Sequence, residues 1–195
     1  MHQISRRILL AGAAGAVAGP ALSQSAPRLP TLREGRGQFV EFEPAERVPD
    51  FRLKRLDGKE VLLSAYQGNV LIVNFWASWC PPCRREIPML DALARTQDPP
   101  GVRVIAISLD QGGAKTVKPY LAELKVRDLP VFLDPDFRVA KRADEATPQD
   151  PFRLFGLPLS YVLSPGGRNL GYFTGLVDWQ SPQARALLES ASRRD

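Results

Sequence analysis

Two nearly continuous apolar runs stand near the middle of the chain, with a periodic segment between them. The runs are residues 70–75 (VLIVNF) and 102–109 (VRVIAISL). Such runs are typical of strands that are buried on both faces of a sheet. Between them, apolar residues recur at helical spacing: Ile87, Leu90, Leu93 and Ala94. The pattern predicts a β-α-β unit whose helix starts after Cys80 and ends at residues 98–101 (DPPG).

Weaker patterns on either side extend this unit to an α/β fold. Upstream, residues 51–54 and 61–63 flank Asp57-Gly58 and predict a hairpin, and residues 39–42 alternate like an edge strand. Downstream, the predicted elements are a helix over 114–124, a strand over 130–133, a helix from Phe137 to about Ala146, a hairpin of strands 160–163 and 169–173, and a helix from Ser181 to about Ala191. We therefore expect helices packed on a mixed sheet, with a β-hairpin as N-terminal extension.

The first 23 residues have the composition of an export signal. Arg6 and Arg7 precede an uncharged run over residues 8–22, and the sequence SRRILL resembles a twin-arginine signal. We expect a signal peptide over 1–23, a flexible linker over 24–37, which is rich in Pro, Gly and Arg, and one domain over 38–195. An uncleaved membrane anchor through residues 8–22 is the alternative. Both interpretations place the domain outside the cytoplasm, in the periplasm.

Composition excludes several classes of function. The formal net charge is +5, but charges of both signs are mixed along the chain without a basic stripe, so nucleic-acid binding has no support. The one histidine, His2, lies within the expected signal. The rest of the chain therefore has no histidine for haem ligation or for a Ser/His/Asp triad. Two cysteines are also too few for a disulfide scaffold.

Cys80-Pro81-Pro82-Cys83 lies between the first buried strand and the helix that follows it. In this context a C-x-x-C motif is typical of a redox-active dithiol. Cys80 is the candidate nucleophile, because the dipole at the helix N-terminus favours its thiolate. Cys83, one turn further, can then attack Cys80 and release a reduced partner. A bridge that only braces the fold is the alternative, but so short a loop constrains little of the unfolded chain.

The two prolines between the cysteines affect the direction of electron flow. Neither has an N–H group, so two donors that would stabilise a Cys80 thiolate are missing. This favours a low reduction potential and a protein that donates electrons. The thiolates could instead bind a metal, but zinc needs four ligands, copper(I) needs at least two soft ones, and only Met89 is nearby. We expect no metal site and no cofactor.

Residues 73–88 (VNFWASWCPPCRREIP) closely resemble the active-site segment of thioredoxin-like proteins and are most similar to the exported TlpA/ResA/CcmG branch. The likeness extends from about Pro49 to Ser190 and implies a thioredoxin-like fold. It implies that the catalytic residues are Cys80, Cys83 and Glu86, with Glu86 influencing the pKa of the cysteines. An ordinary exposed helix acid is the alternative for Glu86. The residues implied in substrate binding are Trp79, Pro81, Pro82, Leu157 and Pro158.

Other positions match or depart from this family. Asn74 stands where thioredoxin has a buried acid, so Glu86 or water would have to accept the proton. Gly156-Leu157-Pro158 matches the family's cis-proline loop, in which the backbone of Leu157 can pair with an extended substrate. A trans proline that opens a strand is the alternative. Residues 141–151 are extra relative to the family, and either border the site or form an inert surface loop.

The resemblance implies an enzyme, a thiol–disulfide oxidoreductase. It would receive electrons from a membrane thiol donor and reduce disulfides in client proteins. For this branch the expected clients are apocytochrome c or the copper-site cysteines of cytochrome oxidase. The alternatives are a copper-handling chaperone and a dithiol oxidase. Peroxide reduction is disfavoured, because the sequence shows no peroxidatic constellation of Thr, Cys and Arg.

Overall fold

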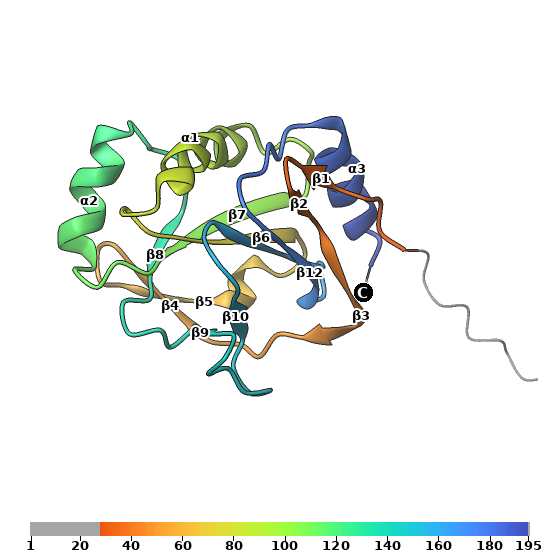
Figure 1. Ribbon diagram of the computed structural model, residues 1–195, viewed down its shortest axis with the longest axis horizontal. Helices are drawn as coiled ribbons and strands as arrows, with labels where there is room; N and C mark the ends of the chain where they lie inside the picture. Colours follow the sequence, from red (N-terminus) through yellow and green to blue (C-terminus); the bar gives the residue numbers. More distant parts are fainter. Residues whose placement is uncertain (1–27, 195) are drawn as a thin grey trace, which may run out of the picture.

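Eight strands form one mixed sheet in the computed structural model, which describes residues 28–194 (Figure 1). They are β3 (Val40–Arg47), β4 (Arg52–Arg55), β5 (Glu60–Leu62), β6 (Val70–Trp76), β7 (Val102–Ser108), β8 (Val131–Leu133), β11 (Leu159–Leu163) and β12 (Arg168–Thr174). Their order in space is β3-β12-β11-β6-β7-β8-β4-β5. The β6, β7 and β8 strands are parallel, and the other neighbours are antiparallel. The predicted mixed sheet is confirmed, with the β4–β5 hairpin as its extension.

The centre of the sheet is formed by β6 and β7, the strands with the strongest apolar patterns. Every residue of β6 is buried, and so is every residue of β7 except Arg103. Their register runs from Val70 opposite Val102 to Trp76 opposite Ser108. Both strands therefore end at the same edge of the sheet. Loops that follow the carboxyl ends of parallel strands are a common place for functional groups.

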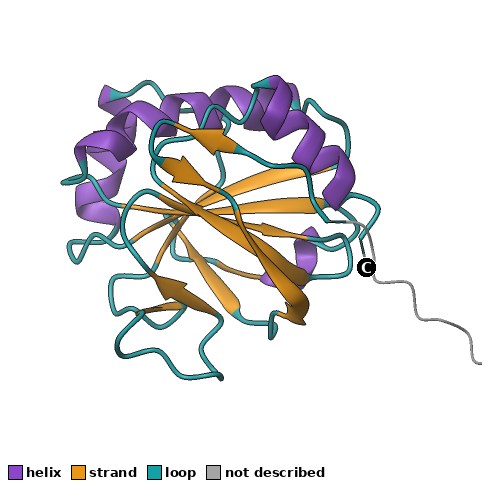
Figure 2. Ribbon diagram, turned by 45° about the vertical axis from the view of Figure 1, so that its right-hand side comes forward, coloured by secondary structure: helices purple, strands orange, loops and turns teal. Residues whose placement is uncertain are grey.

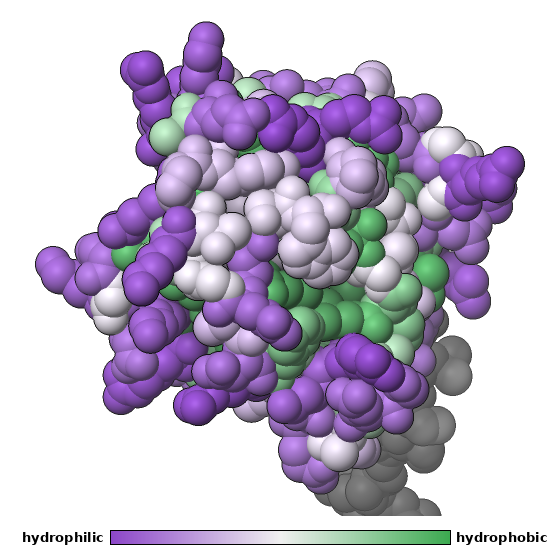
Figure 3. Space-filling model, turned by 60° about the vertical axis from the view of Figure 1, so that its left-hand side comes forward, coloured by the Kyte–Doolittle hydropathy of each residue, from purple (hydrophilic) through white to green (hydrophobic). Residues whose placement is uncertain are grey.

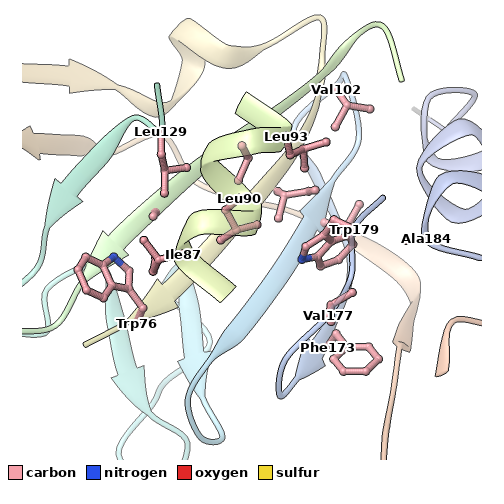
Figure 4. Packing of buried hydrophobic residues seen from close by; sticks show 14 of the residues in the cluster. Trp76, Ile87, Leu90, Leu93, Val102, Leu129, Phe173, Val177, Trp179 and Ala184 are labelled. Atoms are coloured by element: carbon pink, nitrogen blue, oxygen red, sulfur yellow. The ribbon is translucent and has the colours of Figure 1, made fainter. Parts of the chain in front are cut away.

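Three α-helices of the described residues lie on one face of this sheet (Figure 1, Figure 2). They are α1 (Pro81–Thr96), α2 (Ala114–Glu123) and α3 (Pro182–Ala191). The α1 helix buries its apolar stripe of Ile87, Leu90 and Leu93 (Figure 4). Trp179 lies beside α1, on the side of the α3 helix. All three predicted helices of this face are confirmed, and α1 is the one that holds the cysteine motif.

The opposite face of the sheet is covered by short elements. They are a 3₁₀ helix (Leu63–Tyr66), β9 (Ala140–Arg142) and β10 (Phe152–Leu154). The last two pair with each other as a separate parallel ribbon. Phe152 is 1% exposed and its ring packs against Phe75 of β6, with 5.3 Å between the ring centroids. The ribbon therefore closes a second hydrophobic core.

The predicted helix from Phe137 to Ala146 is wrong, because a local turn directs the chain into β9. The carboxylate of Asp134 accepts hydrogen bonds from three successive backbone N–H groups, those of Arg138, Val139 and Ala140. Phe137 has a left-handed backbone conformation, with φ of 54°. The left-handed conformation of Phe137 is incompatible with a helix that starts at this residue, and Ala140–Arg142 form a strand instead.

The segment ahead of β3 packs against the domain. Leu29 and Leu32 are 8% and 0% exposed, and β1 (Arg33–Glu34) and β2 (Gly37–Gln38) form a small hairpin. The expected flexible linker over 24–37 is therefore wrong for residues 28–37. The expected signal peptide over 1–23, its alternative as an anchor through 8–22, and residues 24–27 lie outside the described residues. Between residues 28 and 194, no helix is both long and apolar enough to cross a bilayer.

Candidate active site

Cys80 and Cys83 lie where β6 gives way to α1. Trp76 ends the strand, and Cys80 is the residue that caps the N-terminus of the helix. The two cysteines are joined by a disulfide bond. Cys80 is 4% exposed, whereas Cys83 has no exposed surface. A partner that approaches from solvent therefore reaches Cys80 and not Cys83.

Within residues 28–194, the sulfur of Cys80 has one backbone hydrogen-bond donor. The N–H group of Cys83 donates to Sγ of Cys80 at 3.3 Å. Pro81 and Pro82 open the helix and carry no N–H group. In the reduced protein, the N–H group of Cys83 and the helix dipole would stabilise a Cys80 thiolate. The prolines limit this stabilisation to fewer donors than a helix start usually offers.

Glu86 lies one turn beyond Cys83 on the buried side of α1, and it has no exposed surface. Its Oε2 accepts a hydrogen bond from Nδ2 of Asn74 at 3.0 Å, and its Oε1 accepts one from the N–H group of Val177 at 3.2 Å. Burial raises the pKa of Glu86 from 4.5 to about 7, and both hydrogen bonds oppose this rise. A carboxyl group with such a pKa can accept or donate a proton at neutral pH. The alternative of an exposed acid is wrong.

Asn74 connects Glu86 to the sheet. Its Nδ2 also donates to Oγ of Ser160 on β11, at 2.9 Å, and both side chains are fully buried. The position that holds a buried acid in thioredoxin thus holds an amide here, and this amide positions the acid of α1 instead. Ser160 was not identified from the sequence. Its one signal is its place two residues after Pro158.

Asp110 fixes the loop that leads from β6 to Cys80, and it was not identified from the sequence either. Its carboxylate is nearly buried and accepts hydrogen bonds from the N–H group of Ser78 at 3.0 Å, from Oγ of Ser78 at 2.6 Å and from Oγ of Ser108 at 2.8 Å. Ser108 ends β7, the neighbour of β6. The position of Cys80, two residues after Ser78, is therefore tied to the rigid centre of the sheet.

The loop over Gly156, Leu157 and Pro158 leads into β11. The peptide bond between Leu157 and Pro158 is cis, as the resemblance implies, and the trans alternative is wrong. The carbonyl of Pro158 accepts a hydrogen bond from the N–H group of Gly175 at 2.8 Å. Among the described residues, no hydrogen bond reaches the backbone of Leu157. Its N–H and C=O groups are free to pair with an extended chain.

A groove of about 520 Å³ opens beside Cys80. Five of the predicted residues line it: Trp79, Cys80, Pro81, Pro82 and Leu157. Gly156 of the cis-proline loop and Arg142 of the extra residues 141–151 also line it, whereas Leu109, Phe137 and Leu154 were not identified from the sequence. Glu86 and Pro158 are not part of the lining. Figure 3 shows one face of the molecule, on which hydrophobic residues gather in a hollow that hydrophilic side chains surround.

The groups that could bind a metal ion near this site are few. The sulfurs of Cys80 and Cys83 are soft ligands once the disulfide is reduced. Met89 is half-buried further along α1. In the part of the chain from residue 28 to residue 194, no three His, Cys, Asp or Glu side chains are grouped so that they could hold a metal ion.

Comparisons with known proteins agree with this geometry. Residues 44–168 match the model of the AhpC/TSA family. The chain is 30% identical over 130 residues to the thiol-disulfide oxidoreductase ResA of Geobacillus kaustophilus, and the match covers 67% of this chain and 68% of that relative. ResA of Oceanobacillus iheyensis is also 30% identical over 130 residues, which cover 65% of this chain and 62% of that relative.

Solved structures show the same similarity. A thiol:disulfide interchange protein of the thioredoxin family from Chlorobium tepidum superposes with a TM-score of 0.58 at 25% identity, covering 75% of this chain and 97% of that chain. A DsbF homologue from Corynebacterium diphtheriae reaches a TM-score of 0.60 at 19% identity, and the match covers 85% of this chain and 98% of that chain. The second similarity supports the fold alone. The chain belongs to the AhpC/TSA family of thioredoxin-like proteins, and it is a thiol–disulfide oxidoreductase.

Proposed function

We propose that this protein reduces disulfide bonds in client polypeptides, with Cys80 as the nucleophile and Cys83 as the residue that resolves the mixed disulfide. The observation that carries the proposal is the arrangement of the two sulfurs. Cys80 reaches the surface in an apolar groove, and Cys83 is buried directly behind it. A client disulfide can therefore contact the sulfur of Cys80 but not the buried sulfur of Cys83.

The reaction consists of two exchange steps. The Cys80 thiolate attacks one sulfur of the client disulfide, forms a bond to it and displaces the second client sulfur as a thiolate. Cys83 then loses its proton and attacks Cys80, which breaks the mixed disulfide and releases the first client sulfur. The client has gained two electrons and takes up protons to form two thiols. The enzyme is left with the disulfide between Cys80 and Cys83, which a thiol donor must reduce again.

Glu86 is the proton acceptor for the second step. It follows Cys83 by one helical turn, is buried with it, and has a pKa raised to about 7 by that burial. We expect Glu86→Gln to slow resolution by about 100-fold at neutral pH, a typical effect of removing a general base. The attack by Cys80 does not need this base and is expected to keep its rate. Stopped-flow measurement of both steps with a peptide disulfide separates the two effects.

The prolines support reduction as the direction. They withhold backbone donors from the Cys80 thiolate, which makes the reduced form less stable and lowers the reduction potential. We further propose that the protein works in the periplasm, that a membrane thiol donor supplies its electrons, and that its clients belong to cytochrome c or cytochrome oxidase assembly. These assignments follow the resemblance to the TlpA/ResA/CcmG branch.

Two experiments test the proposal. Equilibration with thiol buffers of known reduction potential gives the potential of the Cys80–Cys83 couple. A value of about −270 mV supports a reductant, whereas a value of about −120 mV refutes the proposed electron flow from this protein to its client. Incubation of the reduced Cys83→Ser variant with a peptide disulfide is expected to trap a mixed disulfide on Cys80, detected by mass spectrometry. The Cys80→Ser variant serves as the matched control. An equally fast adduct on its Cys83 would overturn the assignment of the nucleophile.

A further inference from the structure

One side of the groove beside Cys80 is built by a segment that leaves the main sheet. The chain departs after β8, forms β9, turns through residues 143–151 and returns as β10. Phe137, Arg142 and Leu154 of this segment line the groove together with Trp79 and Cys80. The segment includes the extra residues 141–151, for which the sequence left two alternatives open. Three residues of the segment border the groove, and one of them, Arg142, belongs to the extra residues 141–151, so these residues are more than an inert surface loop.

This side of the groove, which we call the β9–β10 wall and to which Phe137, Arg142 and Leu154 belong, is anchored to the main sheet. The hydroxyl group of Tyr161 on β11 accepts a hydrogen bond from the N–H group of Arg153 and donates one to the carbonyl of the same residue. Phe152 is buried beside it, with 4.8 Å between its ring centroid and that of Tyr161. Leu154 lies two residues after Phe152 on the same strand, so these contacts fix its position beside the groove. A surface that is already ordered loses little entropy when a ligand binds.

The wall offers apolar surface without an unpaired charge. Phe137 and Leu154 are both half-buried in the second hydrophobic core and face the groove with their remaining surface. Arg142 also lines the groove, but its guanidinium group is paired with Asp144 at 2.7 Å and with Glu145 at 3.4 Å. The groove therefore favours an apolar occupant, which removes this surface from water, over a charged one.

The position of Cys80 determines which molecule occupies the groove. Its sulfur belongs to the same groove, so a polypeptide that brings a disulfide to Cys80 also brings the residues next to its cysteine. The free backbone of Leu157 can hold such a segment in an extended conformation. We propose that the β9–β10 wall selects client segments with a bulky aliphatic or aromatic side chain next to the disulfide cysteine. This inference rests on the proposed function.

The test uses two peptides, each closed by one disulfide, which differ only at the two neighbours of the attacked cysteine: leucine in one peptide and serine in the other. The measured quantity is the ratio of the second-order rate constants at which the reduced protein attacks them. We expect the wild-type protein to prefer the leucine peptide by about tenfold, a typical effect of an apolar side chain in a pocket. In Leu154→Glu the ratio is expected to fall to about twofold or less. The matched control is Leu62→Glu on β5, where Leu62 is 43% exposed, and it is expected to keep the wild-type ratio.

The outcomes separate this inference from the proposed function. Equal rates with both peptides in the wild-type protein overturn the inference and leave the proposed function intact. Attack on neither peptide overturns both. A preference that persists in Leu154→Glu, but disappears in Trp79→Ala, also overturns the inference, because the opposite lining would then carry it. If Leu154→Glu does not fold, Leu154→Ser removes the same apolar surface without a charge, and the same fall in the ratio is expected.

Discussion

The buried carboxyl group of Glu86 makes the stability of this protein depend on pH in a direction that one substitution can test. In the folded state its pKa is raised to about 7, chiefly because burial disfavours the charged form. In the unfolded chain the group has its ordinary pKa of 4.5. Between these two pH values the folded protein binds more protons than the unfolded chain. The free energy of unfolding therefore falls as the pH rises from about 4.5 through about 7.

The size of the effect follows from the two pKa values. One pH unit corresponds to about 1.4 kcal/mol, so the ionisation of Glu86 costs the folded state about 3 kcal/mol once the pH exceeds both values. Glu86→Gln replaces the group by a neutral one of nearly the same shape, which resembles the protonated acid at every pH. Relative to the wild-type protein, the variant is expected to gain about 3 kcal/mol of stability between pH 4.5 and pH 8.

Urea denaturation of the oxidised protein, at a series of pH values, measures this difference. Other groups also titrate in this range. Burial raises the pKa of Asp134, for example, but such groups contribute equally to both proteins and cancel in the difference. The same substitution at Glu189, an exposed residue of α3, is the matched control. A difference between wild type and Glu86→Gln that stays constant from pH 4.5 to 8 would refute the account of Glu86 as a buried acid that holds its proton.

Three further substitutions test other parts of the structure. Asp110→Ala leaves the half-buried N–H group of Ser78 without its acceptor, so we expect a loss of about 1–3 kcal/mol in urea denaturation and a slower attack by Cys80. Unchanged values for both would contradict the role of Asp110 in fixing the loop. Tyr161→Phe removes both hydrogen bonds to Arg153, and hydrogen exchange is expected to show faster exchange of that amide while β6 keeps its protection. Leu90→Ala opens a cavity under α1 and is expected to cost about 2–5 kcal/mol in urea denaturation; a cost below about 1 kcal/mol would mean that the helix is not packed as described.

The centre of the fold could be predicted because its signals are local. All seven residues of β6 are buried, so the strand appears in the sequence as one apolar run. The helix that follows shows its buried stripe at helical spacing, and the cysteine motif lies at its start. Each of these signals is complete within a few residues, and no distant contact is needed to interpret it.

The segments that could not be predicted owe their structure to contacts with distant residues. Val139 and Ala140 form an apolar pair too short to distinguish a strand from a helix. Asp134 binds the N–H groups of both residues and turns the chain, and Ala140 then opens β9 because β10 pairs with it. Leu29 and Leu32 lie in a Pro- and Arg-rich segment that looks like a linker. They are buried because the finished domain offers them an apolar surface.

The residues of the candidate site also fall into those that a local motif predicts and those that depend on distant contacts. Trp79 and Cys80 are found from the motif itself. Asp110 acts on Ser78 across 32 residues of sequence, and Ser160 meets Asn74 across 86. Leu154 borders the groove on a strand that Tyr161, a residue of the distant β11, anchors. Pairings over such distances leave almost no local pattern in a single sequence, and only the folded chain brings their residues together.

The surroundings of Glu86 also have a consequence for the order in which the site is completed during synthesis of the chain. Val177, which donates to Glu86, follows it by 91 residues, and Ser160, which holds Asn74, is made nearly as late. A nascent chain therefore displays both cysteines long before the carboxyl group behind them is enclosed. During that interval the buried acid that we propose as proton acceptor is not in place, and the exchange between the two cysteines has no assistance from it. The carboxyl-terminal part of the protein supplies none of the reacting atoms, yet its arrival is what converts two thiols into a controlled redox centre.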